Sequence, residues 1–237
     1  MNYDWSWSIF GQMSLDGVHT FLQSILIGTG WTLALAVCGW IFGLALGLVF
    51  GIARTVRSKP LRVVSATYVE FFRGIPLLVQ MFLWYFVVPE LLPAEMGRAI
   101  KGLPIPWAQF VPALLCLSLY QGAHMTEIIR AGVQSVARGQ KNAAAAMGFS
   151  PAQVYRYVIL PQAFRLIIPP LTSQMMSTVK SSSVAMTIGL LELTGAARSM
   201  QEFSFHVFEA FSAATLIYLL LNVTVVQAMR RLDRSFN

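Results

Sequence analysis

Residues 138–162 read RGQKNAAAAMGFSPAQVYRYVILPQ, a polar insert in a chain that is otherwise strongly apolar. The insert is too polar and too interrupted to cross a bilayer, although apolar segments lie on both sides of it. Ala143–Ala146 are strong helix formers and predict a first helix over about 136–147. Gly148 follows this helix directly, at the place where glycine commonly ends a helix in a left-handed turn.

A second helix is predicted immediately after the glycine. Ser150 is a favoured N-cap residue, Pro151 suits the first helical position, and Gln153 completes a capping box. Pro161 then marks the entry to the next apolar segment. The pattern predicts a rigid helix–glycine–helix elbow at the membrane surface, with small side chains that suit a groove of another protein. An ordinary amphipathic loop lying on the lipid surface is the alternative.

The composition is typical of a polytopic membrane protein. Of the 237 residues, 56% are hydrophobic and 11% are charged, whereas a soluble domain carries about a quarter charged residues. The net charge of +7 does not indicate nucleic acid binding, because basic residues between membrane spans are expected from topology alone. Cys38 and Cys116 lie inside apolar runs, and no Cys/His cluster has metal-ligand spacing, so no metal site and no disulfide framework are predicted.

Five membrane-spanning helices are predicted, each with roughly the 20 residues that a crossing requires. Their ranges are about 22–53, 63–88, 107–125, 162–188 and 207–229. In the second span the uncharged run, Ile75–Val88, covers only 14 residues, so the span must include the residues before it. That inclusion places Glu70 and Arg73 at or near membrane depth.

Lysine and arginine placement predicts the orientation of the chain. Twelve basic residues fall on one side of the predicted spans, and these are Arg54, Arg57, Lys59, Arg62, Arg130, Arg138, Lys141, Arg156, Arg165, Arg230, Arg231 and Arg234. Only three, Arg98, Lys101 and Arg198, fall on the other side. Because cytoplasmic loops carry the excess of basic residues, the N-terminus is predicted outside and the C-terminus in the cytoplasm.

The expected fold class is therefore an all-α polytopic membrane protein with a cytoplasmic helical loop at 136–161. The transmembrane domain covers 22–231, preceded by an N-terminal segment, 1–21, on the outer side and followed by a cytoplasmic tail, 232–237. In the N-terminal segment, Trp5, Trp7 and Phe10 fit a stretch that lies at the membrane interface.

A glycine recurs at every fourth position of the first span, at Gly39, Gly43, Gly47 and Gly51. On a helix these residues form one smooth ridge that another backbone can approach closely. Packing within the chain is the simpler explanation of the ridge, and packing between subunits is the alternative.

Charged groups at membrane depth are costly and usually functional, and Lys180 is the clearest example. It lies about 14 residues after Leu166, which is roughly 20 Å into a hydrocarbon core of about 30 Å. Its ammonium, beside Ser181, Ser182 and Ser183, is predicted to hold the carboxylate of an acidic substrate. Pairing with a carboxylate of a partner subunit and snorkelling outward are the alternatives. Pro169 and Pro170 are expected to interrupt the helix below Lys180.

Two further pairs of charged residues are spaced by one helical turn. Glu70 and Arg73 are candidates for the substrate pathway, with a simple ion pair as the alternative, and Gly74 and Pro76 loosen the same turn. Pairing also explains Glu127 and Arg130, as does contact with a partner. The outer loops, about 89–106 and 189–206, carry mixed charges and are expected to be solvated.

The elbow resembles the "EAA" loop of ABC importer permease subunits. In GQKNAAAAMGFSPAQVYRYVILP, the family's first triplet corresponds to Asn142, Ala143 and Ala144, its glycine to Gly148, and its Leu-Pro pair to Leu160 and Pro161. Asn142 departs from the family, which usually has Glu there. The stretches FFRGIPLLVQ (71–80) and LPQAFRLIIPPLTSQMMSTVKSSSVAMTIGLLEL (160–193) resemble the second and fourth spans of the polar amino acid subfamily. The segments RGQKNAAAAMG and VPELLP most resemble those of glutamate/aspartate importer permeases.

The resemblance implies a type I ABC importer fold and a role as its non-catalytic translocation subunit in the bacterial inner membrane. The elbow would seat in a cytoplasmic ABC ATPase dimer, which binds ATP and Mg, since this chain has no G-x-x-x-x-G-K-[ST] loop and no cofactor of its own. A homologous permease or second copy and a periplasmic solute-binding protein complete the complex. The substrate is expected to be glutamate or aspartate. Glutamine or basic amino acids, an ion-coupled secondary transporter and a non-transporting scaffold are the alternatives.

Overall fold

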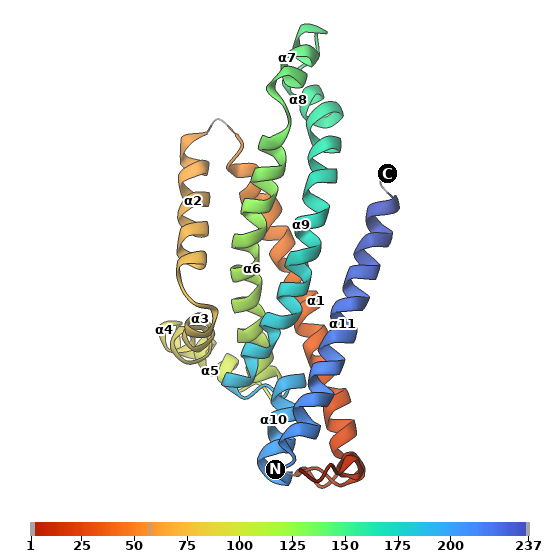
Figure 1. Cartoon of the computed structure of the whole chain (residues 1–237). Helices are drawn as coiled ribbons and strands as arrows, with labels where there is room; N and C mark the ends of the chain where they lie inside the picture. Colours follow the sequence, from red (N-terminus) through yellow and green to blue (C-terminus); the bar gives the residue numbers. More distant parts are fainter. Residues whose placement is uncertain (1–2, 57, 236–237) are drawn as a thin grey trace. The chain divides into compact units, whose positions relative to one another are not determined.

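The structure is a computed structural model that describes residues 3–56 and 58–235, with side chains to Arg231. Arg57 and residues 236–237, which belong to the orientation count and the predicted tail, lie outside the described residues. In chain order the elements are η1 (Trp7–Gly11), α1 (Phe21–Ala53), α2 (Lys59–Gly74), α3 (Leu77–Phe82), η2 (Leu83–Val87), α4 (Val88–Leu91), α5 (Ala94–Lys101), α6 (Trp107–Ser135), α7 (Arg138–Ala146), α8 (Pro151–Val154), η3 (Tyr155–Ile159), α9 (Leu160–Ser181), η4 (Ser182–Ile188), α10 (Leu193–Ser204) and α11 (Val207–Ser235). Figure 1 labels the helices along the chain.

The predicted all-α class is confirmed in the described part of the chain, where the β pairing consists of one isolated bridge between Met13 and Thr20. The chain divides into two compact units, and the long helices α1, α6, α9 and α11 each contribute to both. One unit comprises residues 1–39, 76–117 and 178–224, and the other comprises 40–75, 118–177 and 225–237.

The glycine ridge of α1 packs within the chain, as the simpler explanation predicted. A Cβ on Gly47 would lie 2.6 Å from the Cβ of Met125, and one on Gly51 would lie 2.8 Å from the side chain of Ile129. Both partners belong to α6. Side chains at these positions would hold the two helices apart, so the glycines are what permits the close contact.

Two helices are long and apolar enough by themselves to cross a membrane, namely Phe21–Ala53 and Val207–Arg231. A third is obtained if α2 and the helical run from Leu77 to Leu91 count as one span. Among the described residues, α6 and α9 are long enough to cross a membrane but not apolar enough, since polar residues and prolines interrupt their apolar sequence. The number of five spans stays a prediction.

The second predicted span, 63–88, is not one continuous helix. α2 ends at Gly74, Ile75 has an extended backbone (φ −107°, ψ 132°), and α3 begins at Leu77. Pro76 explains the break, because it lacks an N–H donor and pushes the residue before it out of the helical region.

The expected interruption of the fourth span at Pro169 and Pro170 is wrong, because both prolines lie inside the continuous helix α9. Each proline removes only its own N–H bond, and the flanking turns keep theirs. The change of geometry comes later, where α9 passes into the 3₁₀ segment η4, which Gly189 ends in a left-handed conformation (φ 87°).

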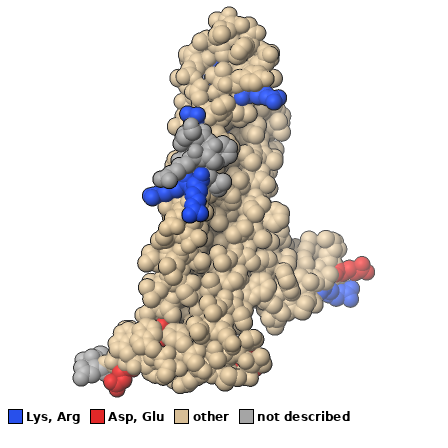
Figure 2. Space-filling view, turned by 90° about the vertical axis from the view of Figure 1, so that its right-hand side faces the viewer, with Lys and Arg blue, Asp and Glu red and all other residues tan. Residues whose placement is uncertain are grey.

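Large parts of the molecular surface carry no charge, as Figure 2 shows for one face. Bulky apolar side chains on α1 and α11 are exposed, among them Val49 and Leu220. Exposed apolar surface on this scale needs lipid or a protein partner around it.

The N-terminal segment is fastened to the start of α11. Glu209 has no solvent-accessible side chain, and it accepts hydrogen bonds from the hydroxyl of Tyr3 and from the backbone N–H of Ser6 (2.7 Å). Trp5 and Trp7 stack on each other beside this anchor and remain half exposed. This arrangement suits the predicted interfacial role, which stays a prediction.

Candidate functional site

The elbow has the predicted geometry. α7 ends at Ala146, and Gly148 adopts a left-handed conformation with φ of 87°. The backbone N–H of Phe149 bonds to the carbonyl of Ala144 at 3.2 Å, and that of Gly148 bonds to Ala145 at 3.0 Å. Together these two bonds form a Schellman motif, which satisfies carbonyls that the helix end leaves without partners.

The predicted capping box also closes the start of α8. The backbone N–H of Ser150 donates to Oε1 of Gln153 at 2.8 Å, and the backbone N–H of Gln153 donates to Oγ of Ser150 at 3.4 Å. The second helix of the elbow is continuous with the apolar segment whose entry Pro161 was predicted to mark. It passes through the π-helical turn η3 straight into α9, and Pro161 is the second residue of that helix.

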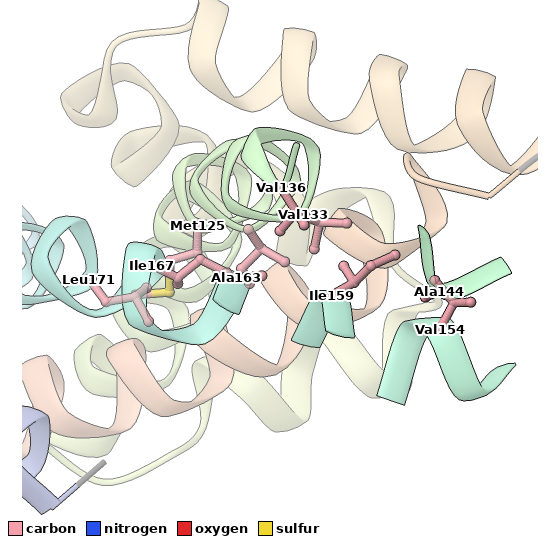
Figure 3. Close-up of a cluster of buried hydrophobic side chains, with 10 residues drawn as sticks. Met125, Val133, Val136, Ala144, Val154, Ile159, Ala163, Ile167 and Leu171 are labelled. Atoms are coloured by element: carbon pink, nitrogen blue, oxygen red, sulfur yellow. The ribbon is translucent and has the colours of Figure 1, made fainter. Parts of the chain in front are cut away.

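A hydrophobic core holds the elbow in place. Ala144 of α7 lies against Val154 of α8, and Ile159 continues the contact toward Val133 and Val136 at the end of α6 (Figure 3). Ala144 is the one member of the predicted coupling set with a buried side chain, and its small size lets α7 and α8 approach each other. The elbow therefore folds as a packed unit with α6 and α9.

Two polar contacts support the same arrangement. The side chain of Gln162 donates to that of Gln140, and the hydroxyls of Thr55 and Tyr155 share a hydrogen bond of 2.7 Å. The elbow is thus joined to the end of α1 as well as to α9.

The outer surface of the elbow is available to a partner. Asn142, Ala143, Gly148, Leu160 and Pro161 are all exposed. Two larger exposed side chains on the same elbow escaped sequence reasoning, Met147 at 75% and Tyr157 at 61% exposure. Met147 carries no charge and belongs to no motif triplet, so no signal in the sequence singled it out.

The predicted pair between Glu127 and Arg130 is confirmed, at 2.7 Å. Glu127 also pairs with Arg54, at the end of α1, so one carboxylate bridges two guanidinium groups. Sequence spacing could not indicate Arg54, which is 73 residues away.

Glu70 and Arg73 are both exposed on α2. The ion pairs formed by described residues do not join them, so the simple-pair alternative is not seen in this conformation. Their place in the substrate pathway stays a prediction.

Lys180 lies in the last turn of α9 and is exposed. Its position at a helix C-terminus favours a cation. The hydroxyl of Ser183 donates to the carbonyl of Lys180, and that of Ser182 donates to Val179, both at 2.7 Å. In this conformation Ser183, which is partly exposed, offers a ligand its oxygen lone pairs rather than its proton. The side chain of Ser182 is fully buried in this conformation. Ser181 is partly buried beside them.

A pair of amides, one buried and one partly buried, escaped sequence reasoning because they carry no charge. The side-chain amide of Gln174 on α9 donates to the side-chain oxygen of Gln121 on α6, and Gln121 is fully buried. Such a contact links two helices in an apolar environment.

The outer segments are helical rather than looped, but their charged side chains are largely exposed, as the sequence suggested, and these include Glu90, Lys101, Arg198 and Glu202. The segments contain the helices α5 and α10, and the side chain of Glu192 is fully buried at the start of α10. Its carboxylate accepts bonds from the backbone N–H groups of Thr194 (3.0 Å) and Gly195 (2.9 Å). The hydroxyls of Thr32 (3.1 Å) and Tyr218 (2.9 Å) also donate to it. Glu192 therefore ties together α1, α10 and α11.

No cluster of three or more His, Cys, Asp or Glu side chains with the geometry of a metal site occurs among the described residues.

The comparisons with known proteins agree with this geometry. The family model described as "Binding-protein-dependent transport system inner membrane component" matches residues 43–237. The glutamate/aspartate import permease protein GltJ of Escherichia coli is 45% identical over 236 residues, covering 99% of this chain and 96% of that protein. The glutamine transport system permease protein GlnP of Escherichia coli is 31% identical, covering 99% of this chain and 98% of that protein.

Solved structures share the fold. A crystal structure of an amino acid ABC transporter with histidines has a TM-score of 0.77 and 31% sequence identity, and the match covers 91% of this chain and 95% of that one. An inward-facing structure of the MetNI methionine ABC transporter, at 21% identity, has a TM-score of 0.74 and covers 95% of this chain and 100% of that one. With its capped elbow and its two apolar spanning helices, this chain belongs to the family of binding-protein-dependent transport system inner membrane components.

Proposed function

We propose that this chain is the transmembrane permease subunit of an ATP-driven importer that moves glutamate and aspartate across the inner membrane. The observation that carries the proposal is the capped elbow, which presents a packed, exposed surface of the kind that an ATPase subunit can grip. The choice of substrate is supported by the relative named for glutamate/aspartate import, which is 45% identical, against 31% for the relative named for glutamine transport.

The elbow acts as the coupling element in this proposal. Asn142, Ala143, Gly148 and Met147 contact a cytoplasmic ATPase, and Leu160 and Pro161 transmit its movement into α9. The ATPase binds ATP and Mg, and its closure moves the elbow as a rigid body. The packing of Ala144 against Val154 supports this step, because a flexible loop would absorb the movement.

The complex contains further subunits. A homologous permease or a second copy of this chain completes the pathway, and a periplasmic binding protein delivers the amino acid to the outer segments. In this assembly the chain crosses the membrane five times, with its N-terminus on the outer side and its C-terminus in the cytoplasm.

The substrate pathway includes the polar residues at membrane depth. Lys180 supplies a positive charge for the side-chain carboxylate of glutamate or aspartate, with Ser181, Ser182 and Ser183 beside it. Glu70 and Arg73 are exposed and available to a substrate or to a partner subunit. A cation at membrane depth suits an acidic substrate better than a basic one, because like charges repel.

The proposal is tested by uptake into proteoliposomes that contain the whole complex. Glutamate, aspartate, glutamine and arginine are compared with and without ATP. We expect ATP-dependent uptake of glutamate and aspartate. In the Lys180→Ala variant we expect their apparent affinity to fall roughly 10- to 100-fold, since a hydrogen bond to a charged group contributes about 1.5–3 kcal/mol. Arg165→Ala, which removes an exposed cation from the same helix, α9, is the matched control.

Each proposal can fail separately in this experiment. Uptake driven by an ion gradient alone contradicts the ATP-driven importer, and the absence of transport under every condition indicates a scaffold. A preference for glutamine contradicts the choice of substrate. An equal fall for all four amino acids in Lys180→Ala, with the complex still assembled, makes Lys180 structural.

A further inference from the structure

A basic pocket lies between the end of α1, the start of α2 and the end of α6, all within one compact unit. Its volume is about 380 Å³. The lining residues are Arg54, Lys59, Arg62, Val63, Ala66, Arg130 and Gln134. Four of these seven carry a positive charge, and none carries a negative charge.

The positive charge in the pocket is only partly neutralised by the chain itself. Glu127 offsets one charge by pairing with Arg54 and Arg130 at once. Lys59 and Arg62 are exposed and form no ion pair with another described residue. Four cations and one carboxylate leave a net charge of three, which repels itself unless an anion enters.

The backbone adds to the same field. α2 starts at Lys59 and directs the positive end of its dipole toward the pocket. Ser58, at the N-cap position, makes no side-chain bond to the first-turn N–H groups. Pro60 has no N–H, and the N–H of Arg62 bonds to the carbonyl of Ser58 (3.2 Å), so the backbone N–H groups of Lys59 and Leu61 are the ones left for an anionic oxygen.

The surroundings of the pocket identify the kind of anion. Next to Arg62 on α2, Val63 is 55% exposed and Val64 is 60% exposed. An exposed apolar surface therefore adjoins the basic residues of the pocket. A ligand that meets both surfaces has an anionic head and an apolar body. The pocket also differs in position from the elbow, because α7 lies farther along the axis of α6 than the α1–α2 turn does (Figure 1).

We propose that this pocket binds the headgroup of an anionic phospholipid from the cytoplasmic leaflet. The side chains of Arg62 and Lys59 contact the phosphate together with the backbone N–H groups of Lys59 and Leu61. One acyl chain lies along the apolar surface of α2 at Val63 and Val64. The site anchors the start of α2, at the end of the helix opposite its break at Pro76, and it goes beyond the transport function proposed above. The proposal follows from the charge and position of the pocket, since clustered basic side chains next to a membrane helix attract acidic lipids.

The test measures lipid retention by the intact complex. The complex is equilibrated in mixed micelles with equimolar phosphatidylglycerol and phosphatidylcholine, and native mass spectrometry counts the lipids that stay bound. We expect phosphatidylglycerol to be retained preferentially. Arg62→Gln and Lys59→Gln should each weaken its retention about fivefold. Arg165→Gln is the matched control, because it removes an exposed cation from α9, which does not line the pocket.

The proposal is overturned by any of three results. Equal loss in Arg165→Gln would mean that only total charge matters. Displacement of phosphatidylglycerol by millimolar inorganic phosphate would identify a site for free anions. If Arg62→Gln released the ATPase and left lipid retention unchanged, the pocket would be a contact with that subunit. Uptake is not part of this readout, so its outcome is independent of the transport proposal.

Discussion

Gly47 is a position where alanine should destabilise the protein although alanine is the better helix former. It lies in the middle of α1, against Met125 of α6. A Cβ added there would be 2.6 Å from the Cβ of Met125 and 3.2 Å from its backbone carbonyl carbon. Carbon atoms in favourable contact are about 3.5–4.0 Å apart. The helices must therefore separate by roughly 1 Å, since neither atom is the free end of a flexible side chain.

The expected magnitude follows from two opposing effects. Replacing glycine by alanine inside a helix stabilises it by about 1 kcal/mol. Overpacking a well-packed core costs about 1–3 kcal/mol. Gly30 provides the matched control, because it lies in the same helix and a Cβ there would meet nothing within 4 Å. Gly30→Ala should raise the free energy of unfolding by about 1 kcal/mol, and Gly47→Ala should fall below Gly30→Ala by roughly the overpacking cost.

Thermal unfolding of the purified protein in the same detergent measures this difference. For a chain of this size, about 1 kcal/mol corresponds to a shift of roughly 2–4 °C in Tm. A gap of about 2 kcal/mol between the two variants should then appear as roughly 4–8 °C. Equal Tm values for the two variants would refute the close contact between α1 and α6.

Three further predictions concern other positions. Gly148→Ala should reduce co-purification of the ATPase with the chain, because Gly148 has a left-handed backbone, where a Cβ costs about 1–2 kcal/mol. Gly139→Ala is the control, because neither glycine is crowded and Gly139 does not have that backbone. Equal co-purification of the ATPase with both variants would contradict this prediction. Glu192→Gln should destabilise the protein by about 1–3 kcal/mol, because the new NH₂ group faces donors in a fully buried position; an unchanged Tm would be inconsistent with the bonds described. Glu209→Ala should release the segment around Tyr3, seen as faster hydrogen exchange there, whereas protection equal to wild type would show another anchor.

The elbow was predictable from sequence because its determinants are local. Gly148, Ser150 and Gln153 act on backbone groups within a few residues of themselves, and such short-range bonds form wherever the chain places them. The break at Pro76 has an equally local cause. It was not predicted, because the second span was assumed to need one continuous helix of about 20 residues. The length of an apolar run indicates that a segment crosses a membrane and does not indicate that it crosses as one helix.

The residues that the sequence could not assign depend on partners far along the chain. Glu192 reads as one charge in a mixed outer loop, and only its burial against Thr32 and Tyr218 makes it a structural anchor. From the sequence, Arg54 is one of many predicted cytoplasmic cations. The structure shows that it pairs with Glu127 and that it lines a pocket together with Lys59. Spacing rules hold within one helix, and they carry no information about which helices meet.

The sequence by itself determined the membrane class, the capped elbow and the family, because apolar length, capping chemistry and motif spacing are properties of contiguous residues. The tertiary structure alone decided which helix packs against the glycines of α1, which carboxylates are buried and where the basic pocket forms. Each of these depends on side chains that are separated by tens of residues and brought together only by helix packing.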